Sequence, residues 1–179
     1  DKLSSLNVSG NDKLESLSCQ NCLLAELDLS NNTSLTTLQC YQNQLIKLNV
    51  SNNKALASLF CDNNQLSELD VRSNTALSTL RCNDNQLSSL DVSNNTSLIS
   101  LTCSKNQLSK LDISNNIKLK QLHCNDNELT SLDLSNNTAL TMLNCANNHL
   151  TSLDAKSTVS YFIRDNQTYS IGDVQGMYY

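Results

Sequence analysis

The stretch Leu38-Gln39-Cys40-Tyr41-Gln42-Asn43-Gln44-Leu45 returns along the chain with a period of 21 residues. Its cysteine recurs without insertion or deletion at Cys19, Cys40, Cys61, Cys82, Cys103, Cys124 and Cys145. A fixed period of this length is typical of a solenoid, in which each turn stacks on the next and buries a shared face. The sequence therefore predicts a repeat architecture.

Each 21-residue unit has two similar halves. One unit reads Leu56-Ala57-Ser58-Leu59-Phe60-Cys61 and then Leu66-Ser67-Glu68-Leu69-Asp70-Val71. In both halves apolar residues alternate with other residues, which is the period of a strand and not of a helix. We expect two short extended segments and two corners in each turn, with very little helix.

Two columns of asparagine fall where the chain must turn. They are Asn43, Asn64, Asn85, Asn106, Asn127 and Asn148, and Asn11, Asn32, Asn53, Asn74, Asn95, Asn116 and Asn137. Asparagine bonds to nearby backbone groups and tolerates left-handed backbone conformations. Because the chain has no proline and only three glycines, we expect these asparagines to form the corners, with stacked amides bonding to one another.

Seven of the eight cysteines form the periodic column. Equivalent positions on neighbouring strands lie about 4.8 Å apart and point the same way. A disulfide needs side chains turned toward each other, and zinc needs four converging ligands. We therefore expect a buried packing ladder, without metal or cofactor. A redox or half-metal role for the C-x-x-C formed by Cys19 and Cys22 is the less favoured interpretation.

The motif L-x-x-L-x-[LC]-x-x-N-x-L, repeated over about residues 3 to 155, resembles the bacterial leucine-rich-repeat family. The 21-residue unit with a strand cysteine is similar to the internalin J type, and the doubled half-pattern to the nested short-repeat class. The resemblance implies a leucine-rich-repeat solenoid: a right-handed coil with a parallel β-sheet on its concave face and the second extended segments on the other side. It also implies secretion or a cell-surface location, ligand binding and adhesion.

The chain divides into two parts. We expect residues 1–155 to form the array, which starts in mid-pattern at Leu3 and Leu6, and residues 156–179 to form a degenerate capping segment or the start of a further domain. The second part holds Tyr161, Phe162 and Tyr169, and aromatic bulk suits the closing of an open hydrophobic end with one or two strands. The mid-pattern start indicates a fragment of a longer protein.

Several function classes find no support. The net charge is −5 and there is no basic stripe, so we expect no nucleic-acid partner. No apolar run approaches the roughly 18 residues that span a membrane. His123 and Cys124 are neighbours in a strand and face opposite sides, and no phosphate loop or serine motif occurs. The sequence predicts a protein that is not an enzyme.

The repeats vary most at the outward positions beside the strand cysteine. Aromatic residues and arginine are enriched at interface hot spots, so we expect Tyr41, Phe60 and Arg81 to anchor a macromolecular ligand. The full set of candidate ligand-binding residues is Tyr41, Phe60, Asp62, Arg81, Asp84, Lys105, His123, Asp126 and Met142. Within this set the acidic residues and Lys105 would form a polar rim.

The chemistry of this face leaves the ligand open. A protein partner is favoured, whereas the many Ser, Thr, Asn and Gln side chains also suit a glycan. A third alternative is a stalk or spacer that presents another domain.

A carboxylate recurs in the second half of the unit. The column is Asp28, Asp70, Asp91, Asp112, Asp133 and Asp154, interrupted by Asn49. Neighbouring carboxylates repel, and calcium binds several oxygens. Calcium ligands normally cluster in a loop, however, and Asn49 fits the same place. We therefore favour a structural role, with hydrogen bonds to nearby backbone, Ser or Thr donors.

Overall fold

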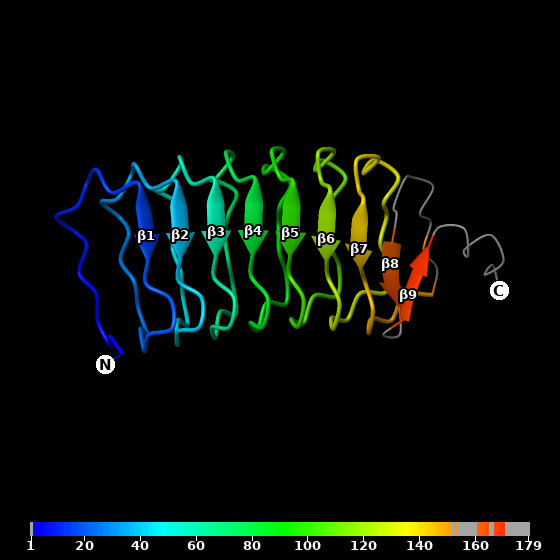
Figure 1. Ribbon diagram of the computed structural model, residues 1–179, viewed down its shortest axis with the longest axis horizontal. Helices are drawn as coiled ribbons and strands as arrows, with labels where there is room; N and C mark the ends of the chain where they lie inside the picture. Colours follow the sequence, from blue (N-terminus) through cyan, green and yellow to red (C-terminus); the bar gives the residue numbers. More distant parts are fainter. Residues whose placement is uncertain (1, 152, 154–160, 165–166, 171–179) are drawn as a thin grey trace.

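The computed structural model describes residues 2–151, 153, 161–164 and 167–170. Its strands form one sheet in sequence order (Figure 1): β1 (Ser16–Ser18), β2 (Thr37–Gln39), β3 (Ser58–Phe60), β4 (Thr79–Arg81), β5 (Ser100–Thr102), β6 (Gln121–His123), β7 (Met142–Asn144), β8 (Tyr161–Arg164) and β9 (Gln167–Ser170). Strands β1 to β8 run parallel, and β9 returns antiparallel to β8. None of the described residues is helical.

The strands pair in the register of the repeat. Leu17 lies opposite Leu38, and Leu38 lies opposite Leu59, one unit further on. The backbone ladder continues beyond the strands, since the N–H of Cys40 donates to the carbonyl oxygen of Phe60 at 2.9 Å. Figure 1 shows the turns side by side along one axis. The predicted leucine-rich-repeat solenoid with a parallel sheet is therefore confirmed.

The core is a column of apolar side chains between the sheet and the opposite segments. Leu38 and Cys40 contribute from the strand side, and Val50 contributes from the second half of the unit; all three are fully buried. The segment around Val50 is not a strand. Each turn thus buries its apolar side chains against the next turn, as expected for a stacked repeat.

The first asparagine column joins successive turns through its side chains. The Nδ2 group of Asn64 donates to the carbonyl oxygens of Cys40 and Cys61, both at 3.1 Å, and its Oδ1 accepts the N–H of Leu45 at 3.0 Å. A buried backbone group without a partner would be unfavourable. The predicted bonding of asparagine to corner backbone is confirmed.

The second column also joins successive turns at the other corner, but through Nδ2 alone, since among the described residues no donor bonds to the buried Oδ1 of Asn95. Asn95 is fully buried, and its Nδ2 donates to the carbonyl oxygens of Val71 at 3.0 Å and Asn74 at 2.8 Å. The expectation that stacked amides bond to one another is wrong. The carbonyl oxygens of the preceding turn lie within reach of each amide and take its hydrogens instead.

The left-handed backbone lies one residue before the first asparagine column. Seven residues have φ between 52° and 57°: Asn21, Gln42, Asn63, Asp84, Lys105, Asp126 and Asn147. The expectation that the column asparagines adopt this conformation is wrong. Their side chains must point inward to reach backbone groups, so the preceding residue makes the reversal, with a side chain such as that of Gln42 in solvent.

One or two strands were expected after the array, and two are present, β8 and β9. β8 pairs parallel with β7, so the sheet extends past the last cysteine-bearing unit. Asp154 and residues 155–160, 165–166 and 171–179 lie outside the described residues. The capping role of residues 156–179 stays a prediction.

Replacing Asn95 by Ala should lower the free energy of unfolding by about 2 kcal/mol, because two buried hydrogen bonds are lost. Asn94 is exposed and donates one bond to the carbonyl oxygen of Arg72, so Asn94→Ala should cost about 0.5 kcal/mol or less. Urea unfolding of both variants measures the difference. Equal losses would contradict the assigned role of the buried amide.

Replacing Gln42 by Gly should raise the free energy of unfolding by up to about 1 kcal/mol, since glycine adopts positive φ without steric cost. Gln44 is exposed and is not among the positive-φ residues. There, the same change should cost roughly 0.5–1 kcal/mol through lost backbone entropy. Thermal unfolding of the pair distinguishes the two signs; a loss at both positions would count against strain at Gln42.

Candidate interaction surface

The outward side chains of β1 to β7, with the residues that follow each strand cysteine, form what we call the strand face. Phe60 ends β3 and Arg81 ends β4, and the two residues lie opposite each other in the parallel register. The guanidinium carbon of Arg81 is 5.7 Å from the centroid of the Phe60 ring, within the range of a cation–π contact. The register therefore brings together two of the three predicted anchors.

Asp62 forms an ion pair with Arg81 and accepts hydrogen bonds from Asn83. Its Oδ2 lies 3.2 Å from Nε of Arg81, and its Oδ1 accepts the backbone N–H of Asn83 at 3.2 Å and its Nδ2 at 2.6 Å. Asp62 is only 2% exposed, which differs from the expectation of an exposed rim. Arg81 and Asn83 of the next turn cover the carboxylate, so it holds Arg81 rather than facing solvent.

Hydrogen bonds continue from this cluster along the strand face. Asn83 donates through Nδ2 to Oγ1 of Thr102 at 2.9 Å and accepts the N–H of Ser104 at 2.8 Å. The hydroxyl of Ser104 then donates to Oδ1 of Asn125 at 2.6 Å. Thr102 and Ser104 are buried, although strand alternation places them outward. Polar side chains of successive turns satisfy one another here and exclude water.

The other charged candidates lie at the corners after the strands. Lys105 Nζ is 3.5 Å from Asp84 Oδ1, and both side chains are partly exposed. The Asp126 carboxylate accepts hydrogen bonds from Nδ2 of Asn125 at 2.5 Å and of Asn147 at 2.6 Å. These corner charges are therefore already paired or bonded within the chain.

The remaining candidates are spread along the sheet. Tyr41 is half-buried and follows β2, the strand next to β3. His123 lies in β6, where burial lowers the pKa of its imidazole. Met142 lies in β7 and is 46% exposed. The structure thus places Tyr41 one strand from Phe60, whereas His123 and Met142 are two and three strands from Arg81.

The aspartate column has the structural role that its pattern predicts. Asp91 Oδ1 accepts the N–H of Ser93 at 3.0 Å, and Asn49 Oδ1 accepts the N–H of Ser51 at the same distance. Hydrogen bonds from the hydroxyl and the backbone N–H of Ser93 lower the pKa of Asp91, and the bonds from Arg72 lower the pKa of Asp70 to about 2. Stabilisation from these carboxylates is present above their unfolded-state pKa of about 3.9 and is lost as the pH falls through the lower folded-state values.

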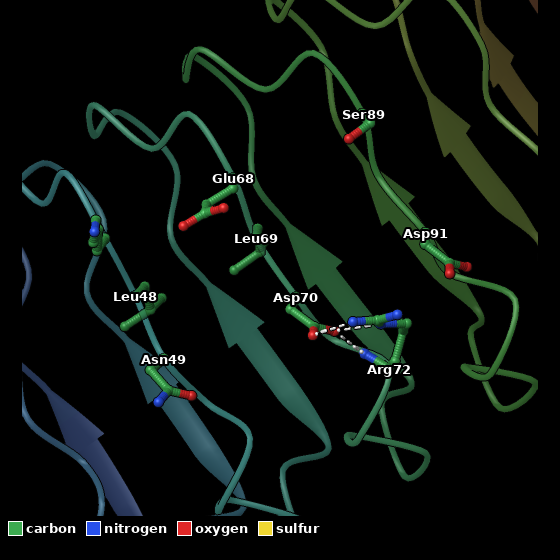
Figure 2. A pocket seen from close by; sticks show the side chains of 9 residues that line it. Leu48, Asn49, Glu68, Leu69, Asp70, Arg72, Ser89 and Asp91 are labelled. Atoms are coloured by element: carbon green, nitrogen blue, oxygen red, sulfur yellow. Dashed lines mark hydrogen bonds and ion pairs between the residues drawn. The ribbon is translucent and has the colours of Figure 1, made fainter.

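A groove on the side of the solenoid away from the sheet was missed by the sequence patterns (Figure 2). It is open, holds about 510 Å³, and is lined by Lys47, Leu48, Asn49, Glu68, Leu69, Asp70, Arg72, Ser89 and Asp91. The sequence feature that could have indicated this groove is Arg72, which occupies a position where other units have serine. Its Nε and Nη2 donate to the two carboxylate oxygens of Asp70 at 3.0 and 2.8 Å, so this guanidinium is engaged within the wall of the groove.

The cysteines are free thiols on the core side of the sheet. Burial raises the pKa of each thiol in the periodic column for which a shift is resolved, to about 11 for Cys19 and further for Cys61. Cys22 is half-buried. Among the described residues, no three His, Cys, Asp or Glu side chains gather as a metal site. In the same ranges, no helix has the length and apolar character to cross a membrane.

Three bacterial leucine-rich-repeat proteins are among the solved structures similar to this chain. The functional domain of InlJ from Listeria monocytogenes, which includes a cysteine ladder, is 35% identical, with a TM-score of 0.75; the match covers 90% of this chain and 41% of that one. The internalin InlF of Listeria monocytogenes is 27% identical, with a TM-score of 0.79 and coverages of 90% and 51%. A leucine-rich-repeat protein of Leptospira interrogans is 26% identical, with a TM-score of 0.79 and coverages of 86% and 43%.

This chain therefore spans about half or less of the length of these three structures. No protein-family model and no curated protein matches the sequence.

A thiol reagent should distinguish Cys22 from the column cysteines. In the native protein at pH 8, 5,5′-dithiobis(2-nitrobenzoate) should label Cys22 rapidly, while the other thiols react only on unfolding, because a buried thiol with a raised pKa forms little thiolate. A Cys22→Ser variant provides the control and should show no fast phase. Rapid labelling of several thiols in the native form of that variant would contradict the burial of the column cysteines.

Proposed function

Because the chain is a leucine-rich-repeat protein whose cysteine-bearing unit is similar to that of InlJ, we propose that it is a non-catalytic module that binds another protein through the strand face. The observation that carries this proposal is the cluster of Phe60, Arg81 and Asp62. It places an aromatic ring and a half-exposed guanidinium on a face of mostly small polar side chains.

The chemistry of the cluster fits a protein interface. Aromatic and arginine side chains carry a large share of the binding energy at such interfaces when neighbouring groups exclude water from them. Arg81 is already held by a cation–π contact and an ion pair. The side chain therefore has less rotamer entropy to lose on binding than a free arginine, which favours affinity.

The resemblance to the internalin J type also supports the setting of this function. We place the module in a secreted or surface-attached protein, where adhesion to a partner protein would be its role. Labelling of intact cells with an antibody against the array tests the location. Labelling only after the cells are lysed would contradict it.

The double variant Phe60→Ala/Arg81→Ala tests the proposed surface. A partner is first identified by cross-linking to the immobilised chain, and its Kd is then measured with purified proteins by surface plasmon resonance. We expect a loss of about 100-fold or more, because two hot-spot side chains are removed. The melting temperature should fall, because Arg81→Ala leaves the buried Asp62 carboxylate without its counterion, so the Kd is measured well below the melting temperature of the variant.

The matched control is Arg72→Ala/Ile117→Ala, which also removes one arginine and one apolar side chain. Arg72 lines the groove away from the sheet, and Ile117 is 57% exposed in a turn. This variant should bind with the wild-type Kd. The proposal is wrong if Phe60→Ala/Arg81→Ala binds as tightly as the wild type, or if the control loses as much affinity.

A further inference from the structure

We propose that Arg81 is a receptor for a carboxylate, so that the partner presents an Asp, a Glu or a chain terminus beside an apolar group. This inference rests on the proposed function and specifies the chemistry of the bound segment. It is carried by the way in which the guanidinium of Arg81 is held, and by the part of it that is left free.

Among the described residues, the guanidinium of Arg81 approaches Asp62 through its Nε edge. The guanidinium atom of Arg81 nearest to Asp62 is Nε, at 3.2 Å from Oδ2, and in the part of the chain that the structure describes the two terminal nitrogens of Arg81 make no hydrogen bond. The side chain is 50% exposed. Two terminal N–H groups side by side match the two oxygens of a carboxylate, which is the geometry of the strong bidentate pair.

Asp62 fixes the direction of this free edge. The carboxylate is buried and is itself held by two hydrogen bonds from Asn83. If Arg81 swung away, it would leave a buried charge without its counterion, which is unfavourable. Asp62 therefore acts as a positioning residue that a ligand does not touch, and the ligand meets an arginine already oriented for it.

Phe60 defines the second half of the site. Its ring lies beside the guanidinium and is half-buried, so an apolar group next to the bound carboxylate can cover the remaining ring surface. Burial of that group would also remove water from the ion pair and strengthen it. The acidic residue of the following corner, Asp84, is paired with Lys105, which reduces its repulsion of an approaching anion.

Arg72 is an arginine of the same chain whose guanidinium is already bound by a carboxylate of the chain. Both carboxylate oxygens of Asp70 already accept from Nε and Nη2 of Arg72 (Figure 2). A ligand carboxylate would have to compete with this intramolecular pair. Arg72 is therefore the internal control, equally charged and 61% exposed, but with Nε and Nη2 already bonded to Asp70.

The test uses the full chain labelled with ¹⁵N-arginine and two probes, N-acetylphenylalaninate and N-acetylphenylalaninamide. The probes share an apolar ring and differ in the carboxylate. Titration at pH 7, followed by the Nε–H resonances, should give a saturable shift of Arg81 with the carboxylate. Binding of the amide should be at least about fivefold weaker, because a charge-assisted pair is lost. Arg72 should not shift.

Two variants separate geometry from charge, with binding followed by saturation-transfer NMR of the probe. Arg81→Lys keeps the positive charge but loses the fork, and should weaken carboxylate binding about tenfold. Asp62→Asn keeps size and an acceptor for Asn83 but frees Arg81. If Asp62 positions Arg81, this variant binds the carboxylate more weakly, by about threefold or more. If net charge alone governed binding, removal of the anion would tighten it.

Equal affinity for the two probes, no shift of Arg81, or an equal shift of Arg72 would each overturn the carboxylate site. Tighter binding by Asp62→Asn, or unchanged binding by Arg81→Lys, would overturn the preorganised fork. These outcomes are distinct from a failure of the proposed function. That failure would be an unchanged Kd of Phe60→Ala/Arg81→Ala for the protein partner, measured without the small probes.

Discussion

The hydrogen bond from a buried asparagine amide to the backbone of the preceding turn is the interaction on which the rest of the structure depends. Asn64 donates to the carbonyl oxygen of Cys40 in the preceding turn as well as to carbonyl oxygens of its own turn. Both carbonyl oxygens to which Asn95 donates lie in the preceding turn. A turn without helix has few other means to satisfy its corner groups. The amide therefore sets how each turn lies on the preceding one, and an insertion shorter than a whole unit would displace it from its acceptors.

That constraint explains which features could be predicted from the sequence. The positions of Leu38, Cys40 and Asn64 follow from a period that both packing and hydrogen bonding enforce, so the strands, the core and the corners can be predicted from the sequence pattern. The positive φ at Gln42 cannot be predicted from it. At that position the units carry Gln, Asn, Asp or Lys, because a reversal that keeps its side chain in solvent tolerates several residue types despite the strain.

The candidate site was predictable in part for the same reason. Strand alternation places Phe60 and Arg81 outward and the register makes them neighbours, so their contact follows from the repeat. The burial of Asp62 does not follow, because it depends on Arg81 and Asn83 closing over it from the next turn. Contacts between variable positions are specific to one pair of units. The groove beside Arg72 was missed because the alternation treats each leucine such as Leu69 as wholly inside, whereas its outer edge remains accessible.

The parallel register between β3 and β4 also bears on how such an array can grow. Each turn contacts its neighbours alone, so duplication of a whole unit elsewhere in the array would lengthen the molecule and leave the Phe60–Arg81 contact intact. A unit inserted between β3 and β4 would keep every leucine, cysteine and asparagine in place and still part the ring from the guanidinium. Duplication of units is therefore constrained at the boundary between these two units, although the leucine, cysteine and asparagine positions are the same there as elsewhere.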